Sequence, residues 1–242
     1  MSDNFLPINL PSKCLPYDGI DSSKVLIRPY QGADEILLSQ ITPINIESKF
    51  LCVLKNVLQG IDPEKLTLGD RFYIILWEFI NSYTNIISLK TMCSHCLKEV
   101  EFSVDLSVLD VNYLPDNYKQ PYPITLSDGL KIQLKLLSIK DLIEAEKYSK
   151  IDSENDFLYE YAASIVDDRG LPEKVTWLKN LKKAKDLALI RAFQEKFAHG
   201  PNMNLKVICP KCQEEEDLIV PFRFEFLFPK GEILTNAFGK GI

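Results

Sequence analysis

Apolar residues recur at helical spacing in several separate stretches of the chain. They lie three or four positions apart in six ranges, each of which predicts a helix: 32–39, 47–58, 68–83, 139–148, 157–166 and 186–198. The range 68–83 is apolar on nearly all sides and follows Thr67, whose hydroxyl can accept a hydrogen bond from the amide of Asp70. This pattern predicts a central helix that the other elements bury.

Shorter stretches predict strands and loops. Apolar and polar residues alternate over residues 129–136, as in a half-buried strand, and residues 25–28 form a shorter strand candidate. Prolines are frequent in residues 1–24 and 113–123, which favours extended or loop structure there. Together the two periodicities predict an α+β fold that is mostly helical.

Two Cys-x-x-Cys turns carry the clearest chemistry: Cys93-Ser94-His95-Cys96 and Cys209-Pro210-Lys211-Cys212. Strand-like residues precede and follow each turn. Two thiolates at this spacing can bind one tetrahedral ion, and two such turns complete a four-sulfur site. We therefore predict a zinc ribbon with Cys93, Cys96, Cys209 and Cys212 as ligands. The zinc would be structural, because four thiolates leave no open position for a reacting water.

Residues 97–208 separate the two turns, so the predicted ribbon is bipartite and a helical insertion splits it. The metal would tie the ends of that insertion together. The expected organisation begins with an extended N-terminal segment (1–24) and an N-terminal helical region that leads to the first knuckle (25–92). The two ribbon halves follow at 93–106 and 203–228, with an inserted strand and helical region between them (107–202), and a C-terminal tail ends the chain (229–242).

Other uses of the cysteines stay open at this point. A redox Cys-x-x-Cys normally opens a helix, which neither turn does, and disulfides are rare in cytosolic chains. The start of the sequence does not resemble a signal peptide, which favours reduced thiols. Of the two remaining cysteines, Cys52 lies among apolar neighbours and is predicted to be a small buried residue, and Cys14 receives no role.

Composition and charge narrow the function classes. The chain carries 28 Lys and Arg against 34 Asp and Glu, a formal charge of −6 that disfavours a dedicated nucleic-acid binder. A local group of lysines predicts a solvated helix face, with phosphate binding as the less favoured alternative: Lys179, Lys182, Lys183 and Lys185. No apolar run reaches the length of a membrane span, about 18 residues.

Motifs for catalysis are absent from the sequence. It contains no glycine-rich phosphate loop, no G-x-S-x-G and no H-E-x-x-H, and only two histidines, His95 and His199. We expect His95 to shape the first cysteine turn and His199 to sit at a helix end, where a cation is favourable. The chain is therefore not expected to be an enzyme, and no small-molecule substrate is predicted.

Near the C-terminus, four phenylalanines alternate along the sequence: Phe222, Phe224, Phe226 and Phe228. Alternation predicts a strand with all four rings on one face. We favour a core position for this face over a docking surface.

The order of several short motifs resembles a known family. They are Leu10-Pro11-Ser12-Lys13, Ile27-Arg28-Pro29-Tyr30 before an acidic helix start, and the two cysteine pairs. This order resembles the baseplate hub assembly proteins of T-even-type contractile-tail phages, over about residues 10–228. The resemblance implies a chaperone-like factor that binds baseplate hub proteins during tail assembly, in the cytoplasm of the infected bacterium. Alternatives are a structural baseplate subunit kept in the virion and a zinc-ribbon module associated with nucleic acid or transcription.

Partner contacts are predicted at four residues: Arg28, Tyr30, Tyr118 and Tyr122. They lie at a predicted strand end or in the proline-rich loop, and loops carry binding more often than cores do. The expected partners are phage hub proteins, with nucleic acid disfavoured and no membrane.

Overall fold

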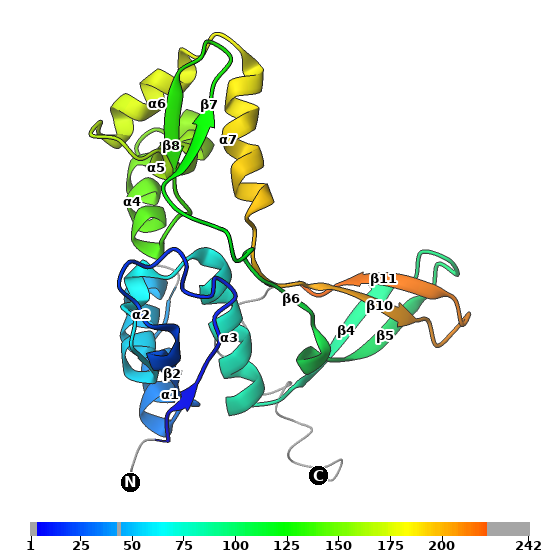
Figure 1. Ribbon diagram of the computed structural model, residues 1–242. Helices are drawn as coiled ribbons and strands as arrows, with labels where there is room; N and C mark the ends of the chain where they lie inside the picture. The colour runs from blue at the N-terminus through cyan, green and yellow to red at the C-terminus, as the bar shows by residue number, and fades with distance from the viewer. Residues whose placement is uncertain (1–3, 43–44, 222–242) are drawn as a thin grey trace.

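The computed structural model describes residues 4–42 and 45–221. It mixes helices and strands, which confirms the α+β class. Figure 1 shows two lobes, one above the other, and an arm of two hairpins that projects from the lower lobe. Within the described residues, none of the helices combines the length and hydropathy that a membrane span requires. The predicted strand of alternating phenylalanines and the tail at 229–242 lie outside the described residues.

The lower lobe is built from the N-terminal part of the chain. Its elements are β1 (Leu6–Pro7), η1 (Ser22–Lys24), β2 (Leu26–Ile27), α1 (Gly32–Leu38), α2 (Ile46–Val57), β3 (Leu58–Gln59), η2 (Pro63–Lys65) and α3 (Leu68–Ser82). The three short strands form an antiparallel sheet in the order β1-β2-β3. The predicted helix starts are close to the observed ones, and Thr67 Oγ1 accepts the Asp70 amide at 3.4 Å as expected.

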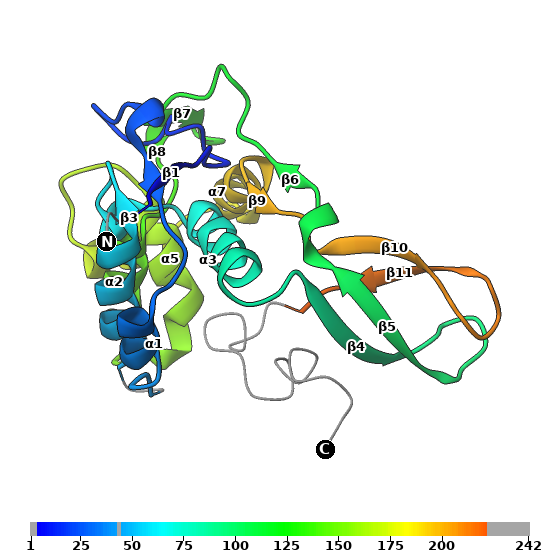
Figure 2. The ribbon, with the colours of Figure 1, turned by 90° about the horizontal axis from the view of Figure 1, so that it is seen from below.

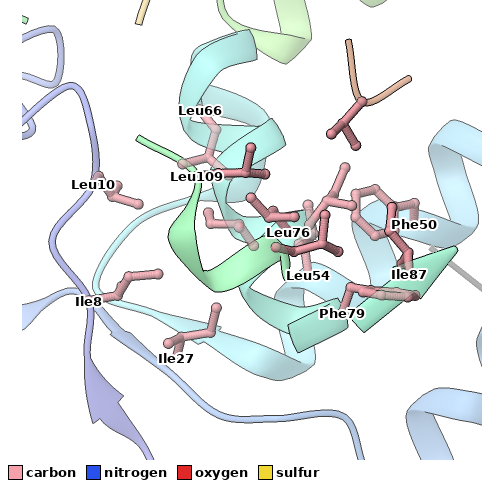
Figure 3. Packing of buried hydrophobic residues seen from close by; sticks show 14 of the residues in the cluster. Ile8, Leu10, Ile27, Phe50, Leu54, Leu66, Leu76, Phe79, Ile87 and Leu109 are labelled. Carbon is pink, nitrogen blue, oxygen red and sulfur yellow. The ribbon is translucent and has the colours of Figure 1, made fainter. Parts of the chain in front are cut away.

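Helix α3 is the centre of the lower core. Its residues Ile74 and Phe79 are fully buried, which confirms the predicted burial of this helix. Figure 3 shows Phe50 and Leu54 of α2 packed beside Phe79, with Ile87 of the arm in the same cluster. Burial of such side chains stabilises each by about 1.5–3 kcal/mol relative to exposure, so α3 anchors both the lobe and the arm.

The arm consists of two antiparallel hairpins. The first pairs β4 (Ile86–Met92) with β5 (Glu99–Asp105), and the second pairs β10 (Asn204–Ile208) with β11 (Glu215–Ile219). Alternation buries one face of the first hairpin, including Leu89 and Phe102, in the same core as Leu218 of the second. Figure 2 shows the hairpins side by side. The first hairpin begins at Ile86, inside the range that we assigned to the N-terminal helical region.

The upper lobe is formed by the segment between the hairpins and has a core of its own, drawn from buried residues between Leu114 and Phe197. The elements of the segment are η3 (Leu106–Val108), β6 (Val111–Asn112), β7 (Tyr122–Thr125), β8 (Lys131–Leu134), α4 (Ile139–Ser149), η4 (Ser153–Asn155), α5 (Asp156–Ser164), α6 (Leu171–Lys179), α7 (Ala184–Lys196) and β9 (Gly200–Pro201).

Helix α6 and strand β7 are the longest elements of this segment that were not predicted from the sequence. Helix α6 buries only three of its nine residues, so its apolar period is weak. Strand β7 contains Pro123 and was expected to be part of a loop. Among the described strands, β7 pairs with β8 alone, so β7 is an edge strand, where a proline is tolerated.

The chain returns from the upper lobe across the start of α3. Strand β6 pairs with β9, and His199 and Gly200 pass over Gly69 at closest backbone contact. A Cβ atom on Gly69 would lie 2.2 Å from the carbonyl oxygen of His199, and Gly200 has a φ of +110°. His199 does meet a helix end, with Nδ1 2.9 Å from the Phe197 oxygen, and its Nε2 also lies 2.6 Å from Thr67 Oγ1.

Substitution of Gly69 by alanine should destabilise the protein by about 1–3 kcal/mol. The new methyl group would collide with the backbone carbonyl of His199, which cannot move aside as the end of a flexible side chain could. Helix propensity alone would predict the opposite, a gain of about 1 kcal/mol. Gly32→Ala is the matched control, since Gly32 also opens a helix and has no atom within 4 Å of the added Cβ. Equal unfolding free energies for the two variants in chemical denaturation would contradict this close packing.

Candidate metal centre

Both cysteine turns end up at the same place, at the tips of the two hairpins. The four Sγ atoms of Cys93, Cys96, Cys209 and Cys212 lie within 4.8 Å of one another, and Cys93 Sγ is 3.8 Å from Cys212 Sγ. A tetrahedral ion with metal–sulfur bonds of about 2.3 Å separates its ligands by about 3.8 Å. The spacing of the sulfur atoms therefore fits one tetrahedral metal ion.

The two turns have the same backbone geometry. In the first, the amide of Leu97 donates to the Cys93 carbonyl at 3.0 Å, and in the second the amide of Gln213 donates to the Cys209 carbonyl at 2.8 Å. Leu97 and Gln213 both adopt positive φ angles, 55° and 63°, which non-glycine residues seldom do. The chain thus forms the same knuckle twice, from sequences that share little beyond the cysteines.

The second knuckle favours an ionised sulfur. Burial opposes ionisation of Cys209, but the amides of Cys212 and Lys211 hydrogen-bond its sulfur and lower its pKa to about 7. Backbone hydrogen bonds favour ionisation of Cys93 and Cys212 as well, but burial and the neighbouring sulfurs outweigh them, so the pKa of Cys93 rises to about 12 and that of Cys212 also rises. Without a metal, the cluster therefore favours one thiolate. The Lys211 nitrogen lies 3.4 Å from Cys209 Sγ. All six cysteines of the chain are free in the structure. A thiolate at near-neutral pH is the form that binds a metal.

A carboxylate that the sequence analysis did not single out joins the two knuckles. Glu216 of β11 accepts hydrogen bonds from the Ser94 amide at 3.0 Å and the Ser94 hydroxyl at 2.9 Å, and these bonds lower its pKa. On the same side, His95 Nε2 lies 2.9 Å from the Glu215 carbonyl oxygen. Glu216 belongs to an acidic run, 214–217, and only the pairing of distant hairpins distinguishes it from its neighbours.

Comparison with known families identifies the group to which the chain belongs. The family model described as T4 bacteriophage base plate protein matches residues 12–229. The chain belongs to this family. Searches of curated proteins and of solved structures gave no match.

Two of the four predicted contact residues of this base plate protein point inward. Arg28 is 7% exposed and donates to Asp34 Oδ2 at 2.7 Å. Tyr118 is 3% exposed, with its ring 4.8 Å from that of Phe197 in an edge-on contact. Arg28 was selected at a predicted strand end and Tyr118 in the proline-rich loop, and both segments pack onto the lobes. Burial gives both residues a structural role, and their contact role stays a prediction.

Tyr30 and Tyr122 are half-buried. The Tyr30 amide donates to Ser82 Oγ at 2.9 Å, which fixes the segment before α1 against the end of α3. Tyr122 packs against Phe197 at a ring distance of 5.1 Å. Each residue is partly exposed, although the Tyr30 hydroxyl is buried, and the contact role of both stays a prediction.

The two remaining cysteines differ in burial. Cys52 is exposed, because the core-facing positions of α2 are Phe50, Val53, Leu54 and Val57 and residue 52 lies outside that stripe. The prediction of a buried Cys52 was wrong. Cys14 is buried in the lower core, and burial raises the pKa of its thiol to about 11. A thiol with so high a pKa is chemically inert.

Close to Arg28, α3 carries a buried acid. Glu78 is fully buried, and burial raises the pKa of its carboxyl from 4.5 to about 8. Its Oε2 accepts from Ser82 Oγ at 3.2 Å, and Oε1 has no hydrogen-bond donor among the described residues. The folded protein therefore holds a proton on Glu78 across a pH range in which the unfolded chain has released it.

This difference predicts that stability falls as pH rises between about 5 and 8, because the native state binds more protons than the unfolded state over that range. Glu78→Gln keeps the shape and cannot ionise. The difference in unfolding free energy, variant minus wild type, should therefore increase by a few kcal/mol between pH 5 and pH 8, as measured by urea denaturation at each pH. Glu154→Gln, at an exposed position, is the control. Parallel pH curves for wild type and Glu78→Gln would contradict the buried proton.

Proposed function

We propose that this base plate protein is a non-enzymatic assembly factor, which binds baseplate hub proteins during tail assembly and is held together by a structural zinc ion. The observation that carries the zinc is the convergence of four sulfur atoms from turns far apart in the sequence. Family membership supports the baseplate role. Hub proteins as partners and a chaperone-like role are what the resemblance to baseplate hub assembly proteins implies. That resemblance rests on the order of the motifs at the start of the chain and at the two cysteine pairs.

Cys93, Cys96, Cys209 and Cys212 would hold the zinc. A site with four thiolates is closed and tetrahedral, so its contribution is folding energy and not chemistry at the metal. The hairpins need such a contribution, because an isolated two-stranded hairpin is marginally stable in water. Each hairpin here pairs only with itself among the described strands. A metal at the tips would fasten the two hairpins to each other at the ends that lie farthest from α3.

Replacement of one ligand tests this site. Cys96→Ser and Cys212→Ser should each lose stoichiometric zinc, measured by elemental analysis of the purified protein, and should melt several degrees lower than the wild type. Cys52→Ser is the matched control, because Cys52 is exposed and lies outside the cluster. Full zinc content together with unchanged melting in either ligand variant would rule out a structural zinc at these residues.

The assembly role is tested by where the protein is found during infection. A tagged copy recovered from infected cells should bring hub proteins with it, identified by mass spectrometry, and should be missing from purified finished phage. Its presence in finished particles would instead assign a structural subunit. Recovery of RNA polymerase or nucleic acid in place of hub proteins would favour the nucleic-acid module, which a formal charge of −6 disfavours.

A further inference from the structure

Helices α2 and α4 come together where the two lobes meet (Figure 1). Residues of both helices line a groove with a volume of about 750 Å³. Leu51 of α2 and Ile143 of α4 line it and pack on the lower core. Tyr148 and Ile151 continue the apolar lining, and their exposed fractions are 36% and 85%. An isoleucine so exposed beside a hollow contributes little to the fold, and apolar side chains gathered at a groove mark a binding surface.

The charges around the groove are unequally compensated. On the α2 side, Glu47 accepts two hydrogen bonds from Arg71, at 2.7 and 3.0 Å, and Glu64 is paired with Lys55 at 3.0 Å. On the α4 side, neither lysine of the lining has an ion-pair partner among the described residues; these are Lys140 and Lys147. Glu144 lies between them on the same helix and offsets one charge, so this wall keeps a positive excess.

The dimensions suit a helix. The lining residues of α4 run from Lys140 to Tyr148, which are eight residues apart and so about 12 Å, or two turns, along the helix. Ile151 follows just after α4 ends at Ser149. A partner helix of two to three turns presents apolar residues at every third or fourth position over that length, and the groove volume lies within the usual range for binding pockets, about 300–1,000 Å³.

We propose that this groove binds an amphipathic helix of a partner protein, with its apolar stripe against Leu51, Ile143 and Ile151 and acidic side chains facing Lys140 and Lys147. The inference rests on the proposed function, since it names a surface through which a baseplate protein would hold its partner. The acidic flank follows from the charge balance: the carboxylates of the α2 wall are already paired, and the lysines of the α4 wall are not.

Two synthetic helical peptides of about 18 residues test the proposal. Both carry the same leucine stripe, with glutamate flanks in one and lysine flanks in the other, and binding to the full-length protein is measured by fluorescence anisotropy. The glutamate peptide should bind at least about tenfold more tightly than the lysine peptide. The double variant Lys140→Glu with Lys147→Glu should invert this preference. Ile151→Ser should weaken both peptides, and Ile36→Ser, at another exposed isoleucine, on α1, should leave both unchanged.

Binding of neither peptide, or equal binding that Ile151→Ser does not change, would overturn the proposal. So would concentration-dependent dimerisation in analytical ultracentrifugation that Ile151→Ser abolishes, because the groove would then be an interface between two copies. Recovery of hub proteins by the Ile151→Ser variant separates the proposal for the groove from the proposal of an assembly role. If that variant recovers hub proteins normally, the groove is not the contact surface and the assembly role stands. If the peptides behave as expected but hub proteins are not recovered by the wild type, the groove stands and the hub role fails.

Discussion

The close passage of His199 and Gly200 over the start of α3 is the contact on which the rest of the structure depends. Two knuckles separated by residues 97–208 can share a cluster only if the returning chain arrives in the correct place. At this crossing, backbone meets backbone at Gly69, Thr67 caps α3 and lies against the His199 ring, and β9 pairs with β6. The second hairpin starts only a few residues later. The packing of His199 and Gly200 on Gly69 therefore fixes the base of the second hairpin and limits where its cysteine turn can lie.

The lower lobe and the arm also share one hydrophobic core, while the upper lobe has another. This division means that the insertion can be a stable unit whose two connections enter and leave at the same crossing. Its helices add no residue to the cysteine cluster. They hold the ends of the insertion, near Asn112 and Gly200, at the distance that β6–β9 pairing requires.

Periodicity and capping were enough to predict the parts of the fold that local sequence determines. Helix α3 has a continuous apolar pattern and a capping threonine, and the two Cys-x-x-Cys turns together have the spacing of a four-sulfur metal site. What could not be predicted depends on contacts between distant residues. In the sequence, Glu216 does not differ from its acidic neighbours, and only the fold brings it to Ser94. Likewise, the sequence does not show that Arg28 is buried in an ion pair with Asp34. Helix α6 and strand β7 depend on packing within the upper lobe, where short apolar patterns are ambiguous.

The division of the cysteine cluster between two hairpins also orders events in time. A ribosome adds about 5–20 residues per second, so the second pair of cysteines emerges roughly ten seconds after the first. During that interval the first knuckle offers two sulfurs and can hold an ion only weakly. The four-sulfur cluster can close only after the upper lobe has been synthesised and has folded back to the crossing. An ion bound at the proposed site would therefore report that the chain had returned to the crossing after the insertion was made.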